Sequence, residues 1–226
     1  MNIAIIPARG GSKRIPRKNI KLFHGKPMIA YSIEAAQNSG CFDKIIVSTD
    51  DQEIADVALQ YGAEVPFIRP ANIADDFATT LDVMQHAINW CTEQDWDIRL
   101  VCCVYATAPF IQPKYIVQGL RLISCDNVEY AFSATTFPFA IQRAIIMTSD
   151  GFVKMMHPEH LNTRSQDLEE TYHDAGQFYW GKASAFLMGK AIFAEHSKAI
   201  LIPRKHVQDI DTPEDWELAE SLFKTL

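Results

Sequence analysis

The chain alternates between short apolar runs and longer segments whose apolar residues recur every three or four positions. Four of the short runs predict buried strands, at residues 2–7, 44–49, 64–69 and 99–106. Four of the periodic segments predict amphipathic helices, at residues 27–40, 50–62, 79–94 and 112–125. This alternation favours an α/β fold with a mostly parallel sheet and helices on both faces.

The stretch at about 137–171 breaks this rhythm. It has a hairpin-like Ser149-Asp150-Gly151 turn and no long helical pattern. We interpret it as an arm inserted into one domain that spans residues 1–226, rather than as a second domain. After it the chain returns to apolar structure, a strand and a closing helix, at residues 177–188, 199–203 and 212–226.

The composition of the 226 residues narrows the class of protein. They are 48% hydrophobic and 22% charged, which suits a folded domain. No apolar run reaches the roughly 18 residues of a membrane helix, and no secretion signal is evident, so we expect a cytoplasmic protein without a membrane partner. The five cysteines form no Cys-x-x-Cys pair, which favours core thiols over disulfides or a zinc site.

Positive charge is concentrated near the start of a chain whose net charge is -7. Seven of the 21 lysines and arginines precede the first acidic residue, Glu34, and the remaining 14 face 28 acidic residues. Because an acidic protein repels a long polyanion, we expect no nucleic-acid partner. A local basic loop suits a small anion with several charges, whereas the common alternative is a solvated charged surface.

The basic segment directly follows the first predicted strand, at the sheet edge where such folds bind ligands. Its glycines allow backbone N–H groups to turn toward an anion. The spacing is neither that of a Walker A loop nor that of Gly-x-Gly-x-x-Gly. Clustered arginines and lysines can nevertheless surround a triphosphate, with Pro16 stiffening the loop.

The segment IPARGGSKRIPRKN at residues 6–19 resembles the signature of the CMP-nonulosonate synthetases, the cytidylyltransferases that activate sialic acid and its relatives. Three further segments fit the same family in order, at residues 25–36, 45–70 and 208–216. The resemblance therefore covers nearly the whole chain. It implies a Rossmann-like nucleotidyltransferase fold, CTP as donor, Mg²⁺ as cofactor, and a homodimer in which the inserted arm crosses to the partner.

The resemblance also implies a set of nucleotide-binding residues: Ala8, Arg9, Gly10, Gly11, Ser12, Lys13, Lys18, Asn19, Arg69, Thr79 and Thr80. Arg9 and Lys13 would also be catalytic, because fixed cations stabilise the charge that builds on departing pyrophosphate. Arg69 would lie near the cytosine. Thr79 and Thr80 also suit the start of the predicted helix, so any ligand role would be additional to capping.

A second informative segment contains Asp209 and Asp211. If it is a strand end, both carboxylates point to one face, and Thr212 and Pro213 then start a helix. A lone Asp-x-Asp is common, and simple capping is the alternative. In the resembling family these aspartates hold the metal, and carboxylate oxygens suit Mg²⁺. We therefore predict that Asp209 and Asp211 are catalytic metal ligands; no histidine or glutamate is an evident general base.

The segments expected to see the sugar, residues 105–111 and a loop at 172–180, resemble the pseudaminic acid branch of the family. The sialic-acid enzymes carry Gln and Arg where this chain has Tyr105 and Ile111. Pseudaminic acid has two acylamino groups and a methyl terminus, so a less polar pocket suits it. The implied sugar ligands are Tyr105, Thr107, His173, Gln177, Phe178 and Tyr179, although the aromatic residues suit a core equally well.

The sequence thus predicts transfer of CMP from CTP to the anomeric hydroxyl of pseudaminic acid, with release of pyrophosphate. The product would serve glycosylation of flagellin or surface polysaccharide. The same reaction on N-acetylneuraminic, legionaminic or Kdo acid is an open alternative. An alternative from another class is a non-catalytic nucleotide- or RNA-binding protein that uses the basic loop.

Overall fold

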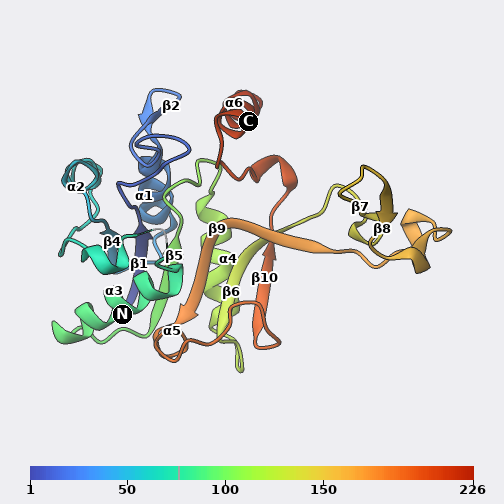
Figure 1. The fold of residues 1–226 in the computed structure, drawn as a ribbon. Coiled ribbons are helices and arrows are strands. Elements are labelled where there is room, and N and C mark those ends of the chain that lie inside the picture. Colours follow the sequence, from blue (N-terminus) through green and yellow to red (C-terminus); the bar gives the residue numbers. More distant parts are fainter. Residues whose placement is uncertain (76) are drawn as a thin grey trace.

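The computed structural model describes residues 1–75 and 77–226, and its centre is a six-stranded sheet (Figure 1). In sheet order the strands are β10 (Ser197–Leu201), β6 (Tyr130–Thr136), β9 (Tyr172–Lys182), β5 (Leu100–Val104), β1 (Asn2–Pro7) and β4 (Lys44–Ser48). β9 runs antiparallel to both of its neighbours, and every other neighbouring pair is parallel. The predicted mostly parallel sheet is confirmed.

Helices cover both faces of this sheet, as predicted. The elements are α1 (Met28–Ser39), α2 (Gln52–Gln60), α3 (Thr80–Glu93), α4 (Pro113–Ile123), α5 (Ala183–Leu187) and α6 (Pro213–Phe223). α1 and α4 share one core cluster with Ala4 and Ile6, whereas α3 and α5 share another with Ile3 and Ile5. Successive β1 side chains therefore point to opposite layers, as the period of a strand requires.

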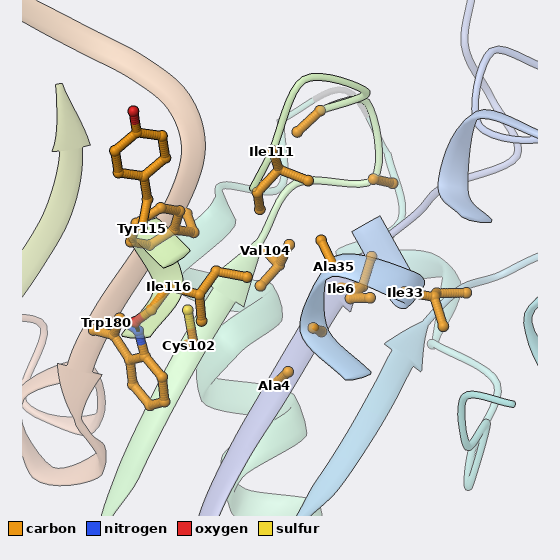
Figure 2. Packing of buried hydrophobic residues seen from close by; sticks show 14 of the residues in the cluster. Ala4, Ile6, Ile33, Ala35, Cys102, Val104, Ile111, Tyr115, Ile116 and Trp180 are labelled. Carbon is orange, nitrogen blue, oxygen red and sulfur yellow. Dashed lines mark hydrogen bonds between the residues drawn. The ribbon is translucent and has the colours of Figure 1, made fainter. Parts of the chain in front are cut away.

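The adjacent cysteines of β5 follow the same alternation. Cys102 belongs to the α1/α4 layer and Cys103 to the α3/α5 layer, and both are fully buried. Figure 2 shows Cys102 beside Ile116 and Trp180 in the first of these layers. All five cysteines are free thiols, but Cys125 is exposed, so the expectation of core thiols is wrong for that residue.

One close approach explains a glycine inside α4. A Cβ on Gly119 would lie 2.5 Å from Cδ1 of Trp180 and 3.0 Å from Cε2 of Phe178, so only glycine lets α4 lie this close to β9. The indole N–H of Trp180 donates to the carbonyl oxygen of Ile116 at 3.0 Å. This contact fixes β9 against α4.

A third, smaller core lies at the end of the sheet where β1 and β5 terminate. It joins the hairpin strands β2 (Leu22–Phe23) and β3 (Lys26–Pro27) to α6 through Phe23, Phe110 and Trp216. Ile210 is buried in the same cluster. The C-terminal segment is therefore packed beside the basic loop, more than 190 residues away in sequence.

The stretch from about 137 to 171 forms an arm that projects away from the sheet (Figure 1). Its regular part is a small antiparallel hairpin of β7 (Ile145–Met147) and β8 (Val153–Met155), flanked by 3-10 helices. The arm leaves at the end of β6 and returns into β9, and these two strands pair with each other. Several of its apolar side chains are exposed, among them Met147 and Phe152.

Three sequence predictions are corrected. Residues 64–69 form only two isolated bridges, Ile46 with Glu64 and Thr49 with Ile68, because Pro66 between them has no N–H for a ladder. Residues 172–180 were expected to form a loop, but they make up most of β9. The sequence patterns also did not predict β6, at residues 130–136. Residues 209–211 are irregular rather than a strand end.

Candidate active site

A cavity of about 540 Å³ opens at the carboxyl ends of β1 and β5. The charged side chains on its wall are five cations and two carboxylates: Arg9, Lys13, Arg14, Lys18, Arg69, Asp75 and Asp211. The wall also includes Ser12, Asn19, Thr79, Thr80, Tyr105 and Thr107. The structure thus brings together most of the nucleotide-binding residues that the sequence indicated. Ala8, Gly10 and Gly11 do not line this cavity.

Gly10 shapes the basic loop by its contact with the end of β4. Its N–H donates to Oδ1 of Asp50 at 2.9 Å, and a Cβ at this position would lie 2.6 Å from Oδ2 of Asp51. The Ala8 N–H donates to the carbonyl oxygen of Ser48 at 3.0 Å. The loop is thereby held over the carboxyl end of β4. The sequence offered the pair Asp50-Asp51 only as a helix start, and its role in holding the loop was missed.

Arg17 anchors the same loop from outside the cavity. Its guanidinium forms ion pairs with Asp51 and Glu53, and the Asp51 side chain also caps α2 by accepting from the Ile54 N–H at 3.1 Å. The Arg17 guanidinium lowers the pKa of the Asp51 carboxyl group. The backbone of Arg17 has φ +57°, an uncommon conformation for a residue other than glycine.

Lys18 and Asn19 connect the loop to the rest of the site. The Asn19 side-chain amide donates to the carbonyl oxygen of Arg9 at 2.9 Å. The Lys18 ammonium donates to the carbonyl oxygen of Ile210 at 2.6 Å and to Oδ1 of Asp211 at 3.2 Å. Nη2 of Arg14 reaches Oδ2 of the same carboxylate at 2.8 Å.

The two aspartates predicted to hold a metal differ in position. Asp211 lines the cavity, whereas Asp209 is an exposed residue that does not. The pKa of Asp209 is raised, first because neighbouring atoms keep part of the water from its carboxyl group and second because Asp211 is negatively charged. The two negative carboxylates repel each other, and a bound cation would reduce that repulsion.

Arg69 is a buried cation on the cavity wall. Its Nη2 donates to the carbonyl oxygen of Ser48 at 2.7 Å, and within the described residues its buried Nε has no hydrogen-bond partner. Burial lowers the pKa of the guanidinium, and the charge of Arg9 acts in the same direction. An anionic group placed in the cavity would stabilise the positive charge of this buried guanidinium.

Thr79 is the N-cap of α3, as predicted. Its hydroxyl accepts from the Asp82 N–H at 3.2 Å, and the Asp82 carboxylate accepts from the Thr79 N–H at 2.8 Å, which completes a capping box. The Thr80 hydroxyl lies 3.3 Å from the Tyr105 hydroxyl. Both threonines also face the cavity, so capping leaves a ligand role available.

A second cavity of about 350 Å³ adjoins the first. Thr80 and Tyr105 belong to both walls. The second wall adds Asp174 and Tyr179, and the Tyr179 O–H donates to the Asp174 carboxylate. Burial raises the pKa of Tyr179 well above its usual value, so this hydroxyl stays protonated. Asp174 was missed by sequence reasoning because the segment was expected to be a loop.

Of the other predicted sugar ligands, Thr107 lines the first cavity, whereas the remaining three line neither cavity. Phe178 has an exposed fraction of 0% and packs in the α1/α4 core, so its ring faces neither cavity. Gln177 is buried, and its side-chain N–H donates to the carbonyl oxygen of His206. The imidazole of His173 packs against Phe137 and does not line either cavity. For Phe178 the expected sugar contact disagrees with its burial.

Three comparisons with known proteins bear on this site. A family model described as "Cytidylyltransferase" matches residues 3–222. The pseudaminic acid cytidylyltransferase of Campylobacter jejuni is 48% identical over 223 residues, which cover 99% of this chain and 96% of that protein. The CMP-N,N'-diacetyllegionaminic acid synthase of Legionella pneumophila is 33% identical over 229 residues, covering 98% and 96%.

Among solved structures, that of a CMP:2-keto-3-deoxy-manno-octonic acid synthetase in complex with CTP superposes with a TM-score of 0.74. The alignment covers 99% of this chain and 98% of that one, at 16% sequence identity. At that identity the likeness concerns the fold alone. It confirms the predicted Rossmann-like nucleotidyltransferase architecture.

Proposed function

This chain belongs to the cytidylyltransferase family, and from that premise we propose that it transfers CMP from CTP to the anomeric hydroxyl of pseudaminic acid, with release of pyrophosphate. The observation that carries the choice of acceptor is the 48% identity to a pseudaminic acid cytidylyltransferase along 99% of the chain. The legionaminic acid synthase is only 33% identical over a similar span. The non-catalytic alternative is set aside, because the family is one of enzymes.

The charge of the first cavity supports the triphosphate as its ligand. Five cations against two carboxylates give the wall a positive excess, while CTP is a small anion with several charges. Arg9, Lys13 and Lys18 lie in the loop that ends β1, where a phosphate chain has access to them. Positive groups at this place would stabilise the charge that develops on the pyrophosphate as it leaves.

We propose that Asp209 and Asp211 hold a Mg²⁺ ion next to this triphosphate. The described residues contain no group of three or more histidine, cysteine, aspartate or glutamate side chains that could hold a metal. Two carboxylates nevertheless suit Mg²⁺, which binds few protein ligands and keeps water and phosphate oxygens for its other positions. The ion would supply charge neutralisation at the phosphate oxygens.

The acceptor would enter from the second cavity. Tyr105 and Thr80 stand on both walls, so the hydroxyl that attacks and the phosphorus that it attacks would meet beside them. The attacking group must lie within about 3–3.5 Å of the phosphorus. Tyr179, which lines only the second cavity, would then contact the sugar rather than the nucleotide.

We also propose that residues 1–226 act as one domain whose arm mediates a homodimer. The arm exposes Met147 and Phe152 at 74% and 72%, and further large apolar side chains of the arm are also exposed, among them Phe139 and Ile145. Five free thiols support a cytoplasmic location. No helix in the described ranges 1–75 and 77–226 is long and apolar enough to cross a membrane.

An equimolar mixture of sugar acids tests the choice of acceptor. The protein is incubated with CTP, Mg²⁺ and equal amounts of pseudaminic, N-acetylneuraminic, legionaminic and Kdo acids, and the CMP-sugars are separated by chromatography against authentic standards, because the pseudaminic and legionaminic products have the same mass. CMP-pseudaminic acid as the main product supports the proposal. Another CMP-sugar as the main product contradicts the choice of sugar but leaves cytidylyl transfer intact.

A further inference from the structure

The second cavity has an apolar wall with one distinctive polar group. Its apolar lining includes Leu81, Phe186, Ile192 and Phe193. Two charged residues belong to it, Asp174 and Lys190. The Lys190 ammonium is already paired with Glu129 at 3.2 Å. Asp174 is different, because no lysine, arginine or histidine among the described residues pairs with its carboxylate.

A bulge in β9 places this carboxylate. Phe132 of β6 pairs with Tyr179, and Ala134, two residues further on, pairs with Asp174, so β9 uses five residues where β6 uses two. Gly176 within the bulge has φ +61°, and its N–H donates to Oδ1 of Asp174 at 3.0 Å. Without the bulge, residues 174 and 179 would point to opposite faces of the sheet. With it, both face the second cavity.

The partners of Asp174 leave acceptor capacity toward the cavity. An ionised carboxylate has about four lone-pair positions and no donor. The Tyr179 hydroxyl and the Gly176 N–H occupy two of them. The remaining positions can only accept, so a ligand placed here must supply an N–H or O–H group.

Charge fixes how a sugar acid would lie across the two cavities. The carboxylate of the acid is attracted by the five cations of the first cavity and repelled by Asp174. The opposite end of the sugar, which in pseudaminic acid carries acylamino and methyl groups, would therefore fill the second cavity. Methyl groups suit its apolar wall, and an amide N–H suits the carboxylate.

We infer that Asp174 determines acceptor specificity by accepting a hydrogen bond from an acylamino N–H of the sugar, and that Tyr179 positions the carboxylate for this bond. The inference rests on the proposed function. It adds a recognition role for two residues that touch each other in the apolar cavity. A hydroxylated sugar chain would lose favourable contacts with the surrounding apolar wall.

The test compares Asp174→Asn with the unaltered protein on three acceptors, which are pseudaminic acid and two analogues that each carry a methyl group on one of its two acetamido nitrogens. The measured quantities are KM and kcat from pyrophosphate release at saturating CTP. For pseudaminic acid, Asp174→Asn should raise the sugar KM roughly tenfold, since the neutral amide oxygen of asparagine is a weaker acceptor than a carboxylate. The KM for CTP should change by less than about twofold.

The methylated analogues separate recognition from steric effects. One analogue should be a poorer substrate of the unaltered protein by roughly tenfold, because it lacks the donor. In Asp174→Asn, the part of this loss that comes from the missing N–H donor should nearly disappear, while the part that comes from steric hindrance by the methyl group remains. An equal loss in both proteins for both analogues would overturn the inference.

Further variants keep the result interpretable. Tyr179→Phe removes the positioning hydroxyl and should raise the sugar KM by less than Asp174→Asn, with sensitivity to methylation retained. Asp126 is an exposed aspartate that lines neither cavity, and Asp126→Asn should behave as the unaltered protein. If Asp174→Asn lowered the Tm and raised the KM for the sugar and the KM for CTP equally, the role of Asp174 would be purely structural, which would contradict the inference. If the unaltered protein did not turn over pseudaminic acid, the proposed function and this inference would both be overturned. If it did, but Asp174→Asn left the sugar KM unchanged, only the inference would be overturned.

Discussion

The ammonium of Lys18 lies 3.2 Å from Oδ1 of Asp211, a residue 193 positions away in the sequence. Nη2 of Arg14 lies 2.8 Å from the other oxygen of that carboxylate. The carboxylate proposed to hold Mg²⁺ is therefore paired with two loop cations. A triphosphate would attract the same cations, so CTP binding and metal binding at Asp211 should assist each other.

A metal ion and the loop cations would compete for the Asp211 carboxylate, and this competition predicts the behaviour of Arg14→Gln. In the absence of CTP, the variant should bind Mn²⁺, used as a spectroscopic substitute for Mg²⁺, a few-fold more tightly, since one competing cation is gone. The gain is limited because Arg14 is largely exposed and such ion pairs contribute about 0–1 kcal/mol. Electron paramagnetic resonance of free Mn²⁺ measures the affinity. Weaker binding in the variant would contradict the competition.

The two neighbouring glycines of the loop give a matched pair of variants. A Cβ at Gly10 meets Asp51, whereas a Cβ at Gly11 meets no atom within 4 Å. We expect Gly10→Ala to lower the stability by about 1–3 kcal/mol, because the loop and the α2 N-cap must move apart. Gly11→Ala should keep the Tm of the unaltered protein. Thermal unfolding followed by circular dichroism checks both, and an unchanged Tm in Gly10→Ala would contradict the described loop.

Arg17 and Asp51 predict a pH dependence of stability. The folded-state pKa of Asp51 is lowered, first by its hydrogen bond from Arg17, so this interaction stabilises the fold above the unfolded-state pKa of about 3.9 and is lost as the pH falls toward the folded value. Arg17→Gln should therefore reduce the free energy of unfolding at pH 7 by about 1 kcal/mol. The difference should shrink below about pH 4. Urea unfolding at pH 7 and below about pH 4 measures this difference in the free energy of unfolding. A difference that grows at low pH would contradict the prediction.

The arm predicts a change in assembly. Phe152→Asp places a charge in the exposed apolar surface of the arm and should convert a dimer into a monomer in analytical ultracentrifugation. Leu218 on α6 is also exposed, at 54%, but lies outside the arm. Leu218→Asp should leave the assembly unchanged. Dissociation by both variants, or by neither, would count against the arm as the interface.

Local patterns were sufficient to predict the elements that depend on nearby residues. The apolar run that became β1 and the capping residues Thr79 and Thr212, each paired with an acid three positions later, are visible in the sequence alone. The central strand β9 was missed because it begins with polar residues and contains the Gly176 bulge. Its strand character comes from pairing with β5 and β6, which are distant in sequence.

The same distinction applies to the site. The basic loop was found from its own residues, but the separate roles of Arg14 and Arg17 depend on their carboxylate partners. Arg17 binds Asp51, 34 positions away, and Arg14 binds Asp211, 197 positions away. No local pattern distinguishes a cation that faces the cavity from one that anchors the loop. Only the folded chain separates Arg14, on the cavity wall, from Arg17 outside it.

The central claim is that the basic loop binds the triphosphate of CTP during transfer to pseudaminic acid. The most direct measurement is the rate of pyrophosphate release with CTP, Mg²⁺ and pseudaminic acid, compared between the unaltered protein and Lys13→Ala. We predict release by the unaltered protein and a rate at least about 100-fold lower in the variant, with the Tm unchanged. Equal rates in the two proteins would contradict the claim, because the loop would then be a charged surface without a role in the reaction.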